Sequence, residues 1–237
     1  MGQDVLADIV GDYLDLLETS AAVYEQKGEY ACGLATSGWC RFMDAASRRL
    51  CGTANNQEAL ICGKWLCHES CWTKASKVTV ETGQQVDVEC DGGIRLYAVP
   101  IRAGVAIVGS INFGYGDPPR EPDKQRELAA KYSVNLDELR AQAETYQTRP
   151  PYFIDLAKRR LHASARLIGA IVERKQTEQA LQEAHDMIRC RAAELGEFNQ
   201  AMVGREQRII ELKEEVNALC RELERAPSYP PVWRVDG

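Results

Sequence analysis

Cysteine is the residue type whose number and placement in this chain best suit chemistry. The 237-residue sequence contains nine cysteines, and seven of them lie between Cys32 and Cys90. Cys67 and Cys71 are four residues apart in a segment that we expect to be helical, which would place their sulfurs on one face about 6 Å apart. That separation suits two ligands of a tetrahedral metal ion.

Two further cysteines could complete such a site. Cys90 ends an expected strand just before a Gly-Gly turn, and Cys40 follows Trp39 in an earlier segment. With Cys67 and Cys71 they would form a closed four-thiolate site for zinc or an iron–sulfur cluster. The spacing is not that of a zinc ribbon, so two alternatives stay open. The thiols could be ordinary core residues, or they could themselves detect oxidants or electrophiles.

The other chemistry-bearing residues give no support to catalysis. A cysteine nucleophile needs a histidine base, and only His68 lies in the cysteine-rich region, where we expect it to be exposed or to support the cysteines from outside. Cys32, Cys51 and Cys62 have no paired spacing, so we expect them in the core. The sequence contains no G-x-S-x-G, P-loop or G-x-G-x-x-G motif. We therefore expect a protein that is not an enzyme.

Hydrophobic periodicity predicts the elements that would hold these residues. It predicts an amphipathic helix over residues 4–27, ending near Gly28, and a second helix over residues 57–77. The last two of four expected strands are joined by a short Gly-containing loop and should form an antiparallel hairpin. Pro100 should lie at an edge or a strand end, because it cannot donate a ladder hydrogen bond. The four expected strands are residues 78–82, 86–90, 94–101 and 105–113, and two short helices are expected at residues 124–132 and 136–146.

The last third of the chain carries the clearest periodicity. Residues 152–224 contain no proline and are dominated by helix-forming residues. Within this segment, apolar residues recur every seven positions in two rows. Such a heptad pattern predicts a left-handed coiled coil with a second copy of the chain. Gly196 and Gly204 could bend or break it, and the alternative is a single amphipathic helix folded back on its own domain. The first apolar row is Leu181, Ile188, Leu195, Met202, Ile209, Val216 and Leu223, and the second is Ala184, Phe198, Leu212 and Leu219, interrupted by Arg191 and Arg205.

Charge and composition exclude several classes of protein. The net charge is −6, which does not favour a nucleic-acid-binding surface. No run of eighteen apolar residues exists, and the acidic N-terminus lacks the basic region of a signal peptide. We therefore expect a cytoplasmic protein that neither spans a membrane nor binds nucleic acid.

Several segments, taken in order, resemble the PocR-type sensory domain, which accompanies bacterial sensor histidine kinases and transcription regulators. The likeness runs from about residue 5 to 170, and residues 171–181 resemble the helical connector that follows PAS-type sensor domains. The matching segments are SGWC (residues 37–40), GKWLCHESCW (63–72), VECDGGIRLYAVPI (88–101) and VGSINFGYGDPP (108–119).

The resemblance implies an α+β fold with a PAS-like antiparallel sheet and flanking helices over residues 1–170. A helical connector and coiled coil would follow over residues 171–225, and an extended tail over 226–237. It also implies a small-molecule ligand, with simple hydrocarbon derivatives as the class. We expect Trp39, Trp72, Tyr97 and Asn112 in the wall of the pocket.

We expect a homodimer that relays its state to a histidine kinase or another signalling protein, since no output domain follows in the sequence. The alternative function is a redox- or metal-responsive module in which the cysteines are the detector.

Overall fold

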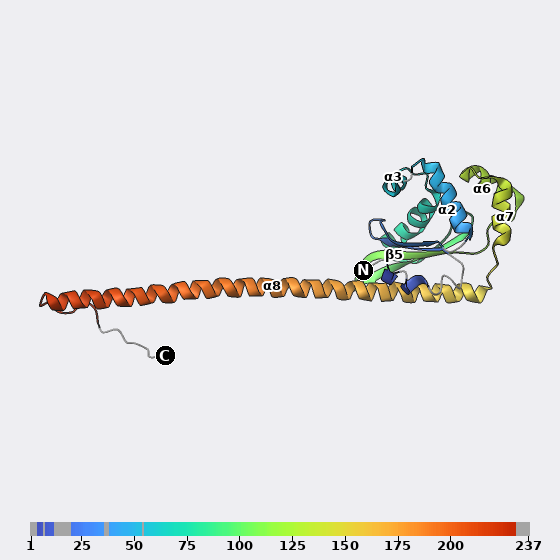
Figure 1. The fold of residues 1–237 in the computed structure, drawn as a ribbon. Helices are drawn as coiled ribbons and strands as arrows, with labels where there is room; N and C mark the ends of the chain where they lie inside the picture. Colours follow the sequence, from blue (N-terminus) through green and yellow to red (C-terminus); the bar gives the residue numbers. More distant parts are fainter. Residues whose placement is uncertain (1–3, 7, 12–19, 36–37, 54, 231–237) are drawn as a thin grey trace. The chain divides into compact units, whose positions relative to one another are not determined.

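A five-stranded antiparallel sheet is the centre of the fold (Figure 1). The computed structural model describes residues 4–6, 8–11, 20–35, 38–53 and 55–230. The strand order is β2-β1-β5-β4-β3, and every neighbouring pair is antiparallel. This confirms the expected α+β class, a PAS-like sheet with flanking helices and a long C-terminal helix. The strands are β1 (Ser20–Glu25), β2 (Tyr30–Ala35), β3 (Val86–Glu89), β4 (Arg95–Ala103) and β5 (Ala106–Tyr115).

The expected hairpin is formed by β4 and β5, the longest strands. Ala98 pairs with Asn112 and Val99 with Ile111. Because successive side chains of a strand point to opposite faces, these two pairs face opposite sides of the sheet. Pro100 lies two residues beyond Ala98, the last residue of β4 that pairs with β3. The strand is locally an edge there, as its missing N–H requires.

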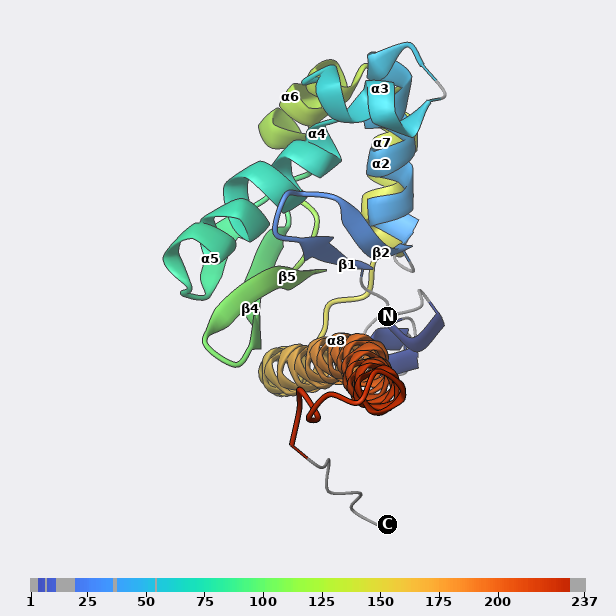
Figure 2. The same cartoon turned by 90° about the vertical axis from the view of Figure 1, so that its left-hand side faces the viewer.

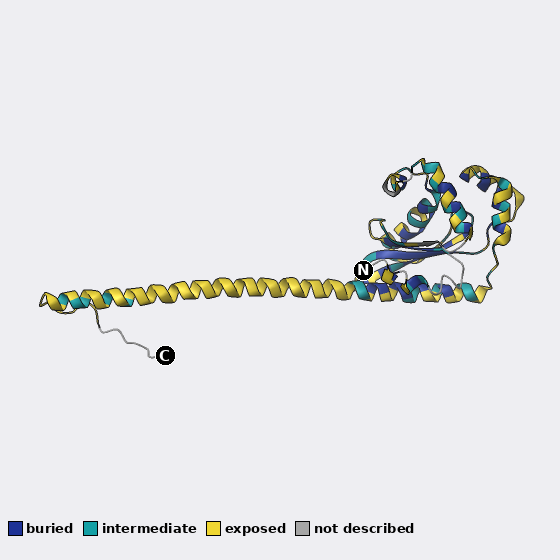
Figure 3. Ribbon diagram, in the orientation of Figure 1, coloured by how far each residue is buried: buried dark blue, intermediate teal, exposed yellow. Residues whose placement is uncertain are grey.

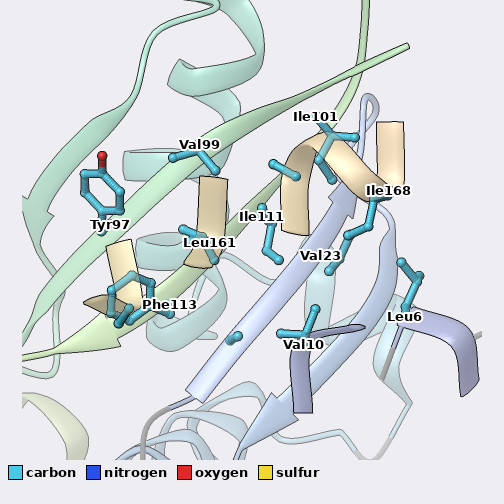
Figure 4. Packing of buried hydrophobic residues seen from close by; sticks show 13 residues of the cluster. Leu6, Val10, Val23, Tyr97, Val99, Ile101, Ile111, Phe113, Leu161 and Ile168 are labelled. Carbon is cyan, nitrogen blue, oxygen red and sulfur yellow. The ribbon is translucent and has the colours of Figure 1, made fainter. Parts of the chain in front are cut away.

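One face of the sheet is covered by the first part of α8 (Pro151–Glu222). Ala157, Leu161, Ala165 and Ile168 of this helix are buried with the apolar side chains of β1, β4 and β5. A Cβ on Gly169 would lie 1.9 Å from the carbonyl oxygen of Arg102, so only glycine allows the helix backbone to approach β4 this closely. Figure 4 shows this core from close by, with Leu6, Val10, Val23, Tyr97, Val99, Ile101, Ile111, Phe113, Leu161 and Ile168 labelled.

The opposite face is covered by shorter helices (Figure 2). The longest helical run on this face is Leu66–Thr82, which contains a π-helical stretch in its middle. Helices α6 and α7 occupy nearly the residues expected from the sequence, and the side chain of Asn135 caps α7 by accepting from the amides of Asp137 and Glu138. The helices are α2 (Gly38–Cys51), α3 (Asn56–Ile61), α4 (Leu66–His68), the π-helical η1 (Glu69–Ser76), α5 (Lys77–Thr82), α6 (Pro122–Tyr132) and α7 (Leu136–Thr145).

The helix expected over residues 4–27 is wrong in its last part. Residues 4–6 and 8–11 are helical, residues 12–19 lie outside the described part of the chain, and Ser20–Glu25 is strand β1. This strand lies between β2 and β5, and Ala21–Tyr24 are buried one after another. A strand buried on both faces loses the alternation by which it would be recognised.

The strand expected at residues 78–82 is also wrong. Lys77–Thr82 is helix α5, which continues directly from η1 and ends at Gly83 in the left-handed conformation (φ +69°). Its alternating valines and threonines have strand propensity, but the helix places Thr79 against the sheet, fully buried. Tertiary packing therefore overrides local preference here.

The chain divides into two compact units, Met1–Gln176 and Thr177–Gly237, and α8 contributes to both. The helix is continuous through Gly196 and Gly204, so neither glycine breaks it. Residues 173–209 of α8 are exposed without exception (Figure 3). None of the described helices combines the length and apolar character that a membrane span needs.

Candidate ligand cavity and its cysteines

A cavity of about 600 Å³ lies between the sheet and the helices opposite α8. Its walls come from β1, β2, β4 and β5, from α2 and from the Leu66–Ser76 helix. The structure brings six of the predicted site residues to this one cavity. They are the four cysteines Cys40, Cys67, Cys71 and Cys90, together with Trp39 and Asn112.

The turn between β3 and β4 holds two of these cysteines in place. Cys90 directly follows β3, and its amide donates to the carbonyl of Ile94 across the turn (2.7 Å). The indole Nε1 of Trp39 donates to the carbonyl oxygen of Gly92 in the same turn (3.1 Å). This bond ties the start of α2, and with it Cys40, to the chain around Cys90.

Asn112 connects the sheet to the helix that carries Cys71. The Asn112 side chain is 1% exposed, and its Nδ2 donates to the carbonyl oxygen of Cys71 (3.1 Å) and to Oγ of Ser76 (2.8 Å). In a π-helix each amide reaches back five residues, as that of Lys77 does to Trp72. Asn112 thus satisfies polar groups at the wide turn and fixes it over the cavity.

Burial keeps three of the cavity thiols, those of Cys67, Cys71 and Cys90, in their neutral form. Desolvation raises the pKa of Cys90 to about 12, and it also raises the pKa values of Cys67 and Cys71. The nearby sulfurs of the other cavity cysteines raise each of them as well. Since the thiolate is the reactive form, these thiols are poor nucleophiles near neutral pH. They form a neutral, polarisable wall.

The four thiols share the cavity without forming a metal site in this arrangement. Zinc needs four ligands around one point, with sulfurs at ~2.3 Å. Within the described part of the chain, no three His, Cys, Asp or Glu side chains are grouped so that they could hold a metal ion. The donor set suits zinc or an iron–sulfur cluster chemically, but its geometry does not fit either group.

A polar corner of the cavity was not predicted from the sequence. Asp44 accepts hydrogen bonds from Nε1 of Trp65 (2.6 Å) and from Nε of Arg48 (3.0 Å), and the Arg48 guanidinium lies 4.0 Å from the centre of the Trp65 ring. All three residues line the cavity. Cys40, Asp44 and Arg48 are spaced four residues apart on α2, which places them on one helix face. That spacing is the signal that could have identified them.

Trp72 and Tyr97 lie outside this cavity. The Trp72 ring packs against Tyr24, with centroids 5.3 Å apart, and covers Gly28, where a Cβ would lie 2.6 Å from the ring. Tyr97 is on the α8 face of the sheet, where its hydroxyl donates to Oε1 of Gln85 (2.8 Å) and is 3.0 Å from Nε2 of His162. The structure therefore separates these two aromatic residues from Trp39 and Asn112.

His68 is buried, so the exposed position, one of the two expected for it, is wrong. It is 5% exposed, and its Nδ1 is 3.1 Å from the hydroxyl of Tyr30. Its ring packs between Tyr30 and Trp65, with centroids 5.4 Å from each. Burial lowers its pKa. His68 stabilises the aromatic cluster beside the cavity and is not among the residues that line it.

Comparison with known proteins identifies no relative of the chain. The chain matches no protein-family model, and it has no match among curated proteins or solved structures.

Proposed function

We propose that this chain is a cytoplasmic sensory protein of the PocR type, which binds a small organic ligand in the cavity and relays its state through a dimeric α8. One observation carries the proposal: the cavity and the first part of α8 lie on opposite faces of the same strands. A change in the strands on ligand binding would act directly on the helix.

Neighbouring residues of the two central strands form this connection. Leu96 and Asn112 line the cavity, and the residues that follow them, Tyr97 and Phe113, belong to the core against Leu161 of α8. A ligand that displaces Asn112 moves Phe113 as well, because the two share a peptide bond. To transmit a signal, the ligand has to bind one arrangement of strands and helix more tightly than the other.

The cavity suits a small, partly polar molecule. Its volume falls within the roughly 300–1,000 Å³ typical of ligand pockets, and its walls are largely apolar. Asp44, Arg48 and Asn112 offer hydrogen bonds for a hydroxyl or carboxyl group, which agrees with the hydrocarbon derivatives implied by the resemblance.

The output is a coiled coil formed with a second copy of the chain. Leu181 is 70% exposed and Ile188 67% exposed in α8, and they begin the apolar row that recurs every seven residues. An apolar stripe of this length needs a partner helix. The dimer would then engage a histidine kinase or another signalling protein.

The proposal is tested by thermal unfolding of the full chain with short-chain alcohols, 1,2-diols and carboxylates as probes. We expect at least one probe class to raise the Tm, and Cys40→Phe, which fills part of the cavity, to remove that rise. Cys190→Phe makes the same change at an exposed position of α8 and should leave the rise intact. Absence of any rise, or a rise that survives in Cys40→Phe, would overturn the ligand proposal.

The gathering of four thiols in one cavity favours one second candidate, a metal- or redox-responsive module with the cysteines as the detector. It requires the thiols to move closer together and to lose their protons, because they are neutral and spread around the cavity wall in this arrangement.

A further inference from the structure

Two cysteines without paired spacing in the sequence are neighbours in the fold. Cys51 is the last residue of α2 and Cys62 directly follows α3. Each precedes a glycine in the left-handed conformation, Gly52 (φ +64°) and Gly63 (φ +67°). Both thiols are half-buried, and neither lines the ligand cavity. Solvent molecules can therefore reach a pair of thiols that has no part in the proposed binding site.

The thiols of Cys51 and Cys62 are close enough for each to affect the pKa of the other. The Cys51 thiol donates to the carbonyl oxygen of Ser47 (3.6 Å) and can turn to donate to the sulfur of Cys62, while the amide of Lys64 donates to the Cys62 sulfur (3.3 Å). The chain after Cys62 is held against α2 by separate contacts. Nε1 of Trp65 donates to Asp44, and the ring of Trp65 lies under the guanidinium of Arg48. The proximity of the thiols thus follows from the packing of α2 against the following segment.

The environment distinguishes the two sulfurs. The hydrogen bond from Cys51 lowers the pKa of Cys62, and the backbone amides of Lys64 and Trp65 and the charge of Lys64 lower it further. Burial and the adjacent Cys62 raise the pKa of Cys51 to about 11. The lowered pKa favours the reactive thiolate form at Cys62, and the raised pKa keeps Cys51 as a neutral thiol. The cavity cysteines Cys67, Cys71 and Cys90 have their pKa values raised.

We propose that Cys51 and Cys62 are a redox-active dithiol that closes to an intramolecular disulfide on reaction with a hydroperoxide. The Cys62 thiolate attacks one peroxide oxygen, the O–O bond breaks, and Cys62 becomes a sulfenic acid while the other oxygen leaves as water or an alcohol. The Cys51 sulfur then attacks the sulfenic sulfur, the S–S bond forms and water leaves. The two thiols lose two electrons, and the peroxide gains them.

The disulfide would act on the wall of the ligand cavity. It would join the C-terminal end of α2, which carries Asp44 and Arg48 into the cavity, to the chain just after Leu60, another lining residue. Oxidation would thereby restrain the polar corner. The chemistry of the pair does not depend on what the cavity binds, so the dithiol and the ligand proposal can fail independently.

The test is oxidation of the full chain with hydrogen peroxide at neutral pH, in a Cys190→Ser/Cys220→Ser background that removes cross-linking between tails. We expect the intact mass to fall by two hydrogens per chain and peptide mapping to identify a Cys51–Cys62 disulfide. Cys51→Ser should stop at a Cys62 sulfenic acid that dimedone traps. Cys62→Ser should lose the rapid reaction.

Cys32→Ser is the matched control, since Cys32 lies in β2 and burial raises its pKa. It should form the Cys51–Cys62 disulfide at the unaltered rate. A different disulfide as the main product, or a Cys62→Ser variant that oxidises as fast as its parent, would overturn the proposal.

Discussion

Nδ2 of Asn112 in β5 lies 3.1 Å from the carbonyl oxygen of Cys71 and donates a hydrogen bond to it. The bond joins a central strand to the π-helical stretch over the cavity, and π-helical turns inside helices are frequent at functional sites. The same amide reaches Oγ of Ser76 at the other end of that stretch. One buried side chain thus links the sheet, the widened helix and a cavity cysteine.

Asn112→Leu tests this link. The substitution keeps the size of the side chain but removes the two buried hydrogen bonds that Asn112 donates to Cys71 and Ser76, which should destabilise the fold by about 1–3 kcal/mol. Urea unfolding of the full chain measures the change. Asn199→Leu, at an exposed position of α8, should change the free energy of unfolding by less than about 0.5 kcal/mol. Equal effects of the two substitutions would refute a structural role for the Asn112 bonds.

Replacing both Ile209 and Val216 by Asp should produce a folded monomer. The two side chains belong to the apolar row of α8, and buried carboxylates would oppose its pairing with a second helix. Light scattering should give half the molar mass of the parent, with the near-UV circular dichroism of the first unit retained.

The matched control is Val203→Asp, which makes the same change beside the row. Val203 is exposed, and it follows the row residue Met202 on the helix. The control should remain dimeric. A dimer that persists in the double variant would show that this row is not the interface.

Several elements could be predicted because local pattern and packing agree. The β4–β5 hairpin has β-branched runs on each side of a Gly-containing turn, and α7 begins at a capping asparagine. The heptads of α8 follow from spacing alone. Prediction failed at β1, where burial on both faces removes the alternation, and at α5, where packing against the sheet overrides strand propensity.

The candidate site also has a part that the sequence predicts and a part that it does not. Cys40, Cys67, Cys71 and Cys90 could be identified by residue type, as could Trp39 and Asn112, and all six line one cavity. Whether Tyr97 or Asn112 points into that cavity depends on which face of a strand each occupies. This in turn depends on register, which a single sequence does not supply. The proximity of Cys51 and Cys62 arises from the packing of α2 against the segment after α3, so spacing could not reveal it.

Gly169→Ala should disrupt the packing of α8 on the sheet. The added Cβ would lie 1.9 Å from the carbonyl oxygen of Arg102, and relief of that overlap should cost about 1–3 kcal/mol. Gly196→Ala is the opposite control, because nothing lies within 4 Å of a Cβ there. It should stabilise the helix by about 1 kcal/mol through helix propensity. Urea unfolding measures the change in the free energy of unfolding for both variants. A Gly169→Ala variant that is also stabilised would contradict the close approach at Gly169.

Stability should fall as the pH falls below about 6.5, the ordinary pKa of histidine. Burial lowers the pKa of His68 in the folded state, so the unfolded chain binds a proton at a higher pH than the folded chain does. The stabilising effect of the neutral His68 ring is therefore complete above the pKa of the unfolded state. It is lost as the pH falls from that pKa toward the lower pKa of the folded state.

His68→Gln should reduce this pH dependence between pH 7 and pH 5, measured as urea midpoints. His185→Gln alters an exposed histidine of α8. This control should show the same change of the urea midpoint with pH as the unaltered chain. If His68→Gln retains the full dependence, another group is responsible for it.

Metal analysis of protein purified without air or added metal tests the metal-responsive form of the second candidate function. Because no three suitable side chains of the described residues are grouped around one point, we expect well under one metal ion per chain and no visible absorbance. The opposite result is equally specific. One zinc ion or a brown iron–sulfur absorbance per chain, lost in Cys67→Ser and in Cys90→Ser but kept in Cys32→Ser, would mean that the thiols close around a cofactor. The cavity would then be a metal centre, and the ligand proposal would fall.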